Sequence, residues 1–168
     1  PDGRYARVCR DCDAISITMP TTVISDAPMV GVYSTLSTQT RAGIESIWNA
    51  RVGAYSVSLL MPEGSENTVK AIQAPLGDLR GCAGTLDEQG PCPYFTGGSR
   101  NTAWFDADTP ATAAHEIGHM WGLPHDSEAG NLMSTYGSSS ALKPWYVDVV
   151  LRNAGLTGRK CGCGEIRP

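Results

Sequence analysis

Long apolar runs and clusters of positive charge are both missing from this sequence, and each absence excludes a class of protein. No apolar run approaches the roughly 20 residues that a membrane-spanning helix needs, and residues 1–13 lack the apolar segment of a signal peptide. Because Lys and Arg form no run and the formal net charge is -4, the sequence offers no electrostatic basis for a nucleic-acid or membrane partner. We therefore expect a soluble protein.

Charged residues are also scarce, at 18% of the 168 residues, whereas hydrophobic residues reach 41%. This composition is typical of a globular protein and not of a disordered chain. The length suits one compact domain with an adequate core, and no repeat or linker divides it. We expect residues 1–168 to form a single, monomeric domain.

The cysteines lie in three pairs that are local in sequence: Cys9 and Cys12, Cys82 and Cys92, and Cys161 and Cys163. The Gly and Pro of "CAGTLDEQGPC" favour a loop closed by Cys82 and Cys92, and disulfides between the terminal pairs could tie the two chain ends together. Closing so long a loop contributes on the order of 4 to 5 kcal/mol in the chain-entropy model. The alternative is a structural zinc held by the four terminal thiolates. Disulfides indicate an oxidising compartment, hence a secreted or extracellular protein.

Alternation of apolar and polar residues predicts a half-buried strand at 14–19, which ends at Pro20. Three more segments are predicted to be strands separated by loops that contain Gly and Pro: 54–61, 68–74 and 101–107.

Helical spacing of apolar residues predicts two amphipathic helices. The first lies between Thr38 and Val52, and Gly53 follows as a stop. The last runs from about Pro144 to Asn153. Its residues that are predicted to pack inward are Trp145, Tyr146, Val149 and Val150.

A third helix begins at Thr109 and Pro110, which suit a cap and a first helical position, and it contains the most informative segment, "HEIGHMWGLPHD". Residues four apart on a helix are about 40° apart around its axis, so His115 and His119 project from one face and can bind one ion.

The residues around these histidines complete a metal motif. Glu116 follows His115, which places its carboxylate beside the metal as the general base. Gly122 ends the helix and turns the chain so that His125 can be the third ligand. The fourth position then stays open for water.

This arrangement predicts peptide hydrolysis without a covalent intermediate. Zinc lowers the pKa of its bound water to about 7, and Glu116 would take the water proton and later deliver it to the leaving amine. The pattern HExxHxxGxxH fixes five positions, so its chance occurrence in a chain this short is on the order of one in 10⁵. The alternative, histidines that only serve packing, is therefore disfavoured.

These residues give the sequence a resemblance to the metzincin clan of zinc endopeptidases, whose hallmark is HExxHxxGxxH followed by a Met-containing turn. The segment "NLMS" at 131–134 is similar to that turn, and the resemblance implies that Met133 lies beneath the zinc as a hydrophobic base. Taken alone, Met133 would be an ordinary core residue.

Features of several subfamilies are combined here. Asp126 after the last histidine is similar to the adamalysin pattern, whereas the compact length and the Leu-Met pair resemble matrixins. Snapalysin-type proteases share the Gly-Leu-Pro run but have Asp in place of His125. Tyr136 comes one residue later than the zinc-ligating Tyr of astacins and serralysins, so an ordinary packed Tyr is expected. The recognisable motifs cover residues 109 to about 137.

The resemblance implies an α+β fold. It consists of an α/β-like upper subdomain, built from a twisted, mostly parallel sheet with two helices including the active-site helix, and of the Met-turn and a C-terminal helix. An extended peptide substrate would pair with an edge strand above the zinc. Our candidate for that edge is 97–105, with a plain connecting strand as the alternative. Residues 134–142 would wall the pocket for the side chain just after the cut bond.

Other interpretations are weaker. Asp106 and Asp108 could bind Ca²⁺, as related proteases do, but capping of the next helix is favoured. A serine hydrolase would need a histidine base, and every histidine already belongs to the metal motif. A secreted, inactive zinc-containing binding module is disfavoured by Glu116 and by the open ligand position. We therefore predict a secreted zinc endopeptidase that acts on proteins or peptides.

Overall fold

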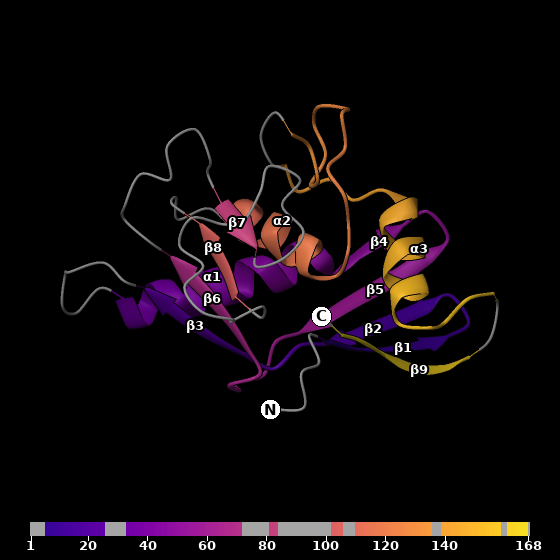
Figure 1. The fold of residues 1–168 in the computed structure, drawn as a ribbon, viewed down its shortest axis with the longest axis horizontal. Helices are drawn as coiled ribbons and strands as arrows, with labels where there is room; N and C mark the ends of the chain where they lie inside the picture. Colours follow the sequence, from indigo (N-terminus) through magenta and orange to yellow (C-terminus); the bar gives the residue numbers. More distant parts are fainter. Residues whose placement is uncertain are drawn as a thin grey trace.

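The computed structural model describes most of the chain (Figure 1), namely residues 6–25, 33–71, 81–83, 102–105, 110–135, 139–158 and 161–167. Its elements in chain order are β1 (Ala6–Asp11), β2 (Ala14–Thr18), β3 (Thr21–Ser25), α1 (Tyr33–Trp48), β4 (Ala50–Val52), β5 (Tyr55–Leu60), β6 (Asn67–Ala71), β7 (Gly81–Ala83), β8 (Thr102–Phe105), α2 (Pro110–Met120), α3 (Pro144–Asn153) and β9 (Gly162–Ile166). The architecture is mixed α+β.

The larger sheet has five strands in the order β4-β5-β2-β1-β9, and only the β2–β5 pair is parallel. The expectation of a mostly parallel sheet is therefore wrong for this half of the fold. Two tight hairpins account for two of its three antiparallel pairs, because a two-residue connection can join only antiparallel neighbours. Cys12 and Asp13 connect β1 to β2, and Gly53 and Ala54 connect β4 to β5.

The smaller sheet has the order β3-β6-β8-β7, with β3, β6 and β8 parallel and β7 antiparallel to β8. Backbone hydrogen bonds from Met19 to Leu60 and from Thr21 to Pro62, both 2.9 Å, continue the parallel pairing from one sheet into the other. β8 has a partner on both sides. Residues 102–105 are thus not the edge that the sequence suggested; among the described strands of this sheet, β7 is an edge, and residues 97–101 lie outside the described part.

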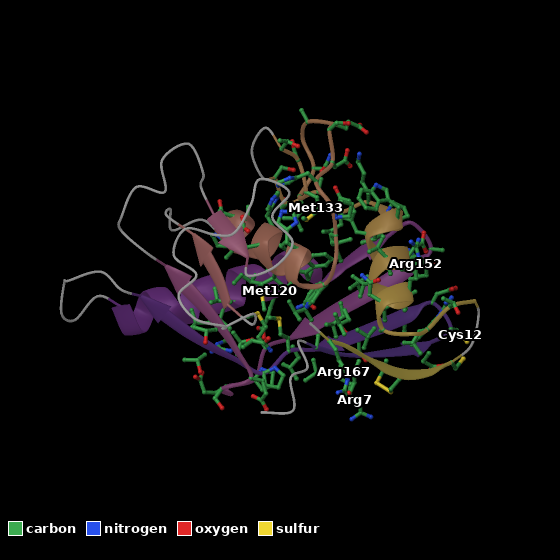
Figure 2. All side chains as sticks on the ribbon, in the orientation of Figure 1. Arg7, Cys12, Met120, Met133, Arg152 and Arg167 are labelled. Carbon is green, nitrogen blue, oxygen red and sulfur yellow. A yellow bond between two sulfur atoms is a disulfide. The ribbon has the colours of Figure 1, made fainter. Side chains whose placement is uncertain are left out.

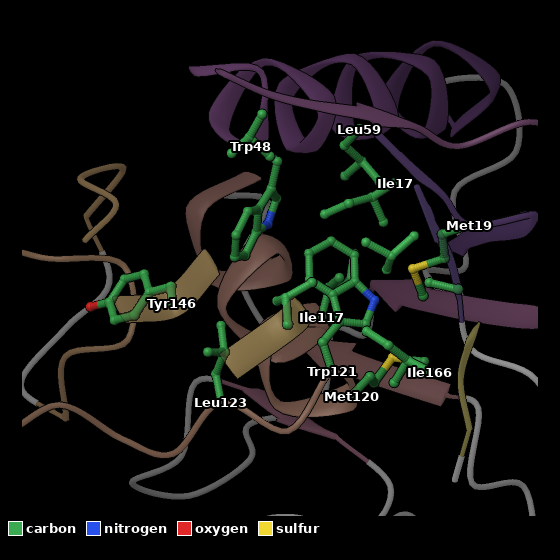
Figure 3. Packing of buried hydrophobic residues seen from close by; sticks show 14 of the residues in the cluster. Ile17, Met19, Trp48, Leu59, Ile117, Met120, Trp121, Leu123, Tyr146 and Ile166 are labelled. Atoms are coloured by element: carbon green, nitrogen blue, oxygen red, sulfur yellow. The ribbon is translucent and has the colours of Figure 1, made fainter. Parts of the chain in front are cut away.

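Helices α1 and α2 pack against each other and against the sheets, α1 on β3 and β5 and α2 on β7 and β8. The first helix was predicted between Thr38 and Val52, but α1 begins at Tyr33 and ends at Trp48. Val52 is buried in β4, so its spacing from the helical residues was coincidental. The Trp48 and Trp121 rings meet edge to face, with centroids 4.7 Å apart, and join the ends of α1 and α2 in the core (Figure 3).

Helix α3 has the predicted bounds, but its buried face differs from the prediction. Tyr146, Val147, Val150 and Leu151 are buried, whereas Trp145 and Val149 are only partly buried. The helix packs on β9 and is joined to β5 by a hydrogen bond of 2.7 Å from the Tyr55 hydroxyl to Asp148 Oδ1. None of the described helices is long and apolar enough to cross a membrane.

A disulfide between Cys9 and Cys163 ties β1 to β9, where these residues face each other in register (Figure 2). It closes a sequence separation of 154 residues. Since both sulfurs are used in this bond, the four-thiolate zinc considered as an alternative does not form. The predicted Cys82–Cys92 loop lies outside the described side chains.

Candidate metal centre

Helix α2 is buried on all sides from Thr112 to Met120, and it ends in a Schellman motif. Gly122 has φ 89, Gly122 N–H donates to the His119 carbonyl at 2.9 Å, and Leu123 N–H donates to the Gly118 carbonyl at 3.0 Å. A Cβ on Gly122 would lie 2.2 Å from Asn153 Nδ2, which itself donates to the Trp121 carbonyl at 2.8 Å. Helix α3 thus closes the end of α2 and fixes where the chain turns back.

Backbone carbonyls fix the tautomers of the two helical histidines. His115 Nδ1 lies 2.6 Å from the Leu132 carbonyl oxygen, and His119 Nδ1 lies 2.8 Å from the Leu123 carbonyl oxygen. A carbonyl can only accept, so in both rings Nδ1 carries the hydrogen. Burial is the main cause that lowers the pKa of His119 to about 3. The neighbouring histidines lower this pKa further, whereas the hydrogen bond to the Leu123 carbonyl opposes the shift. This ring is therefore neutral at pH 7, and its Nε2 presents a lone pair.

The Nε2 atoms of the three histidines converge on one point. The His115 and His119 atoms are 3.0 Å apart, and the His119 and His125 atoms are 3.1 Å apart. In a neutral ring whose Nδ1 holds the proton, Nε2 carries only a lone pair, and converging lone pairs of this kind can bind a shared cation. The geometry therefore favours a metal ion over a hydrogen-bonded histidine cluster.

The donor set fits zinc. Zn–N bonds of 2.0 to 2.1 Å in a tetrahedral site place ligand nitrogens about 3.3 Å apart, close to the observed separations. Three neutral imidazoles are a common protein ligand set of catalytic zinc, and the carbonyls on Nδ1 are the second-shell acceptors that orient such ligands. The three residues also form one of two groups among the described residues that could hold a metal ion.

Glu116 is buried, with 5% of its surface exposed, and follows His115 on α2. Carboxylates are seldom buried to this degree without a partner or a chemical task. Its place beside the first histidine is the one expected for a general base.

Met133 is fully buried and packs against the histidine helix (Figure 2). A Cβ on Gly118 would lie 2.6 Å from Met133 Sδ, so the absence of a side chain at Gly118 lets the thioether approach α2 directly. The Met133 carbonyl accepts from Asp126 N–H at 2.7 Å. This bond ties the turn around Met133 to the residue that follows His125.

A polar network that the sequence did not reveal braces this turn. Lys143 Nζ contacts Asp126 Oδ2 at 2.6 Å and Glu128 Oε2 at 2.7 Å. The hydrogen bond from Lys143 is the main cause that lowers the pKa of Asp126. The Tyr146 hydroxyl contacts both Asn131 and Asp126, and burial raises its pKa to about 12. From the sequence, one could predict only that Lys143 lies just before a helix, and not which carboxylates it contacts.

Several predicted residues lie outside the described part of the chain: Asp106, Asp108, Tyr136 and Cys92. Neither group of candidate metal ligands among the described residues indicates Ca²⁺, because one consists of histidines and the other contains two thiols. Calcium is therefore not supported.

Comparison with known families matches residues 15–148 to the family described as Metallo-peptidase family M12. The match covers more than half of the chain and includes the three histidines. Among curated proteins, none matches the chain.

Proposed function

The chain belongs to metallo-peptidase family M12, and from this we propose that it is a secreted zinc endopeptidase of the metzincin type. His115, His119 and His125 would hold the zinc, and Glu116 would act as the general base. The observation on which this proposal depends is the convergence of the Nε2 atoms, with the tautomers of two rings fixed by carbonyl acceptors.

Zinc bound there would supply a Lewis acid that polarises the scissile carbonyl and lowers the pKa of a water molecule to about 7. Glu116 accepts one proton from the attacking water as the new carbon–oxygen bond forms. As the carbon–nitrogen bond breaks, the same carboxyl group returns that proton to the leaving amine, so the reaction consumes one water and leaves the enzyme unchanged. No histidine remains to serve as an alternative base.

An extended peptide would bind along β7, which is one of the two outer strands of the smaller sheet among the described strands and packs against α2. Main-chain pairing at such an edge fixes the peptide direction while leaving the side chains to separate pockets. Residues 134–142 would form one of these pockets. The disulfide between Cys9 and Cys163 supports an extracellular location, because such bonds persist in oxidising compartments.

The decisive experiment compares casein cleavage by the wild type and by Glu116→Gln at equal zinc content. We expect kcat/KM to fall by about 10² to 10⁴ because the variant keeps the shape of the side chain but cannot accept the proton. Glu63→Gln, at an exposed position, is the matched control and should retain full activity. Equal activity of Glu116→Gln and wild type would remove the proposed base. If wild type cleaves nothing in a broad peptide library, the inactive binding module becomes the better interpretation.

A further inference from the structure

Two thiols lie together on the surface, apart from the metal centre. Cys12 and Cys161 are exposed, and neither takes part in the disulfide between Cys9 and Cys163. The two side chains are close enough to hydrogen bond, and ligand atoms of Asp11, Cys12 and Cys161 lie within 4.8 Å of one another. Figure 2 shows Cys12 at the tip of the β1–β2 hairpin.

Strand register explains why these thiols meet. β1 and β9 are antiparallel, with Cys9 opposite Cys163 and Arg10 opposite Gly162. Moving forward along β1 therefore means moving backward along β9. The residue before β9 is Cys161, which comes next to the turn that contains Cys12.

The backbone at Cys12 is unusual. Its φ is 52, in the left-handed region that hairpin turns normally give to Gly, Asn or Asp. No other non-glycine residue in the described part of the chain has a positive φ. A cysteine is a poor choice for this conformation on backbone grounds alone. Its presence there suggests that the thiol itself is the useful group.

Arg10 holds the two thiol-bearing segments together. Its Nε donates to the Cys12 carbonyl at 2.8 Å, and its Nη1 donates to the Gly158 carbonyl in the segment that leads to Cys161. The guanidinium also lies 5.8 Å from the centre of the Tyr55 ring. The pair is therefore pre-organised and does not meet by chance on two independent loops.

We propose that Cys12 and Cys161 form a second disulfide next to Cys9–Cys163, so that β1 and β9 are cross-linked once within the strands and once just beyond the end of β1 and the start of β9. A dithiol and a carboxylate could also bind a metal, but the neighbouring disulfide already uses the same two strands in an oxidised form. This inference does not depend on the proposed peptidase activity.

The reaction is thiol–disulfide exchange with a low-molecular-weight disulfide such as oxidised glutathione. One protein thiolate attacks a glutathione sulfur and releases the first glutathione thiol, and the second protein thiolate then displaces the other glutathione from the mixed disulfide. The protein loses two protons and two electrons, and glutathione gains them. The hydrogen bond to Cys161 and the charges of Cys161, Asp11 and Asp13 raise the pKa of Cys12, which keeps its thiolate fraction low.

The second cross-link would support helix α3. Among the described strands, β9 is at an edge of the larger sheet, and α3 packs against it. The Ala154 carbonyl is so close to Gly164 that a Cβ at Gly164 could not be accommodated. Because α3 supplies Tyr146 and Asn153 to the surroundings of the metal centre, detachment of β9 would loosen both. We expect oxidation of the thiol pair to protect the β9 edge from proteolysis.

The test uses the full chain incubated in a glutathione redox buffer, then alkylated and mapped by mass spectrometry without reduction. We expect a linked peptide pair that contains Cys12 and Cys161, about two daltons lighter than its reduced form. In Cys12→Ser, Cys161 should become alkylatable while Cys9–Cys163 stays intact. Asp13→Asn should accelerate formation of the bond, since it removes a charge that raises the pKa of Cys12.

Limited proteolysis provides the second measurement. Cleavage between α3 and β9 should be several-fold faster in Cys12→Ser than in the oxidised wild type. The proposal fails if both thiols remain alkylatable after oxidation, or if either thiol pairs with another cysteine. It also fails if added zinc alone protects both thiols from alkylation under oxidising conditions and a chelator restores their reactivity, because that result would assign the pair to a metal site.

Discussion

Removal of the disulfide between Cys9 and Cys163 should reveal how much of the stability comes from joining the chain ends. In the chain-entropy model, a link across 154 residues lowers the entropy of the unfolded chain by about 17 cal/mol/K, which is about 5 kcal/mol at 25 °C. This is a large share of the typical 5 to 15 kcal/mol stability of a domain. We expect the double variant Cys9→Ala, Cys163→Ala to lose close to this amount only when no second link joins the ends.

A neighbouring link would reduce that loss. With Cys12 joined to Cys161, the ends stay tied, and Cys9–Cys163 closes only a ring of about seven residues, worth about 2 kcal/mol in the same model. The double variant should therefore lose about 2 kcal/mol in the oxidised wild-type background and about 5 kcal/mol in a background with Cys12→Ser and Cys161→Ser.

Urea unfolding at 25 °C, followed by tryptophan fluorescence, measures both differences from midpoints and slopes. A loss below about 1 kcal/mol in the background without Cys12 and Cys161 would refute the chain-entropy reasoning. Equal losses in the two backgrounds would show that the second link contributes nothing.

Three further predictions test the site and its supports. Gly118→Ala should destabilise the protein by about 1 to 3 kcal/mol, because the new methyl group would clash with Met133 Sδ. Thermal unfolding with and without zinc measures this loss. An unchanged unfolding midpoint would mean that the Met133 side chain can move aside without cost. Zinc at about 100 times its Kd should raise the free energy of unfolding by about 2.7 kcal/mol, and a chelator should reverse this increase. An equal increase in His115→Ala would show that the zinc binds elsewhere. Tyr55→Phe should cost about 0.5 to 1 kcal/mol at pH 7 by removing the hydrogen bond to Asp148. That bond raises the pKa of Tyr55, so its stabilisation is present below pH 10 and is lost as the pH rises through the folded pKa; a cost that persists at high pH would contradict this assignment.

Local signals in the sequence located the elements around the site. Pro110 and Gly122 mark the ends of α2 because each has a backbone property that a helix terminus requires, and the alternation that starts at Ala14 gave β2. Strands β1 and β9 were missed because Arg, Cys and Gly dominate them. Their pairing is held by a cross-link and by partners distant in sequence, which no local pattern records.

For the candidate site, the spacing of the histidines was enough to predict that their rings would face one another, and the structure brings their Nε2 atoms together. Zinc binding itself stays a prediction. Lys143, Tyr146 and Asn131 could not be assigned from sequence, because their contacts with Asp126 and the Met133 turn depend on how α3 docks. A sequence motif can identify ligands that lie on one helix or a short loop. Residues that contact the site from other elements of the fold have no fixed spacing from the ligands, so no motif identifies them.

The joining of β1 to β9 also sets the order of events during synthesis. A ribosome delivers β1 first and β9 more than 150 residues later, so the larger sheet lacks one edge until the last strand has emerged. Only then can α3 pack against β9. This packing also positions the Asn153 amide, which donates to the Trp121 carbonyl at the end of the histidine helix. A nascent chain therefore contains all three histidines before β9 is available to pack against α3, so the support of the histidine helix forms after the histidines themselves have been made.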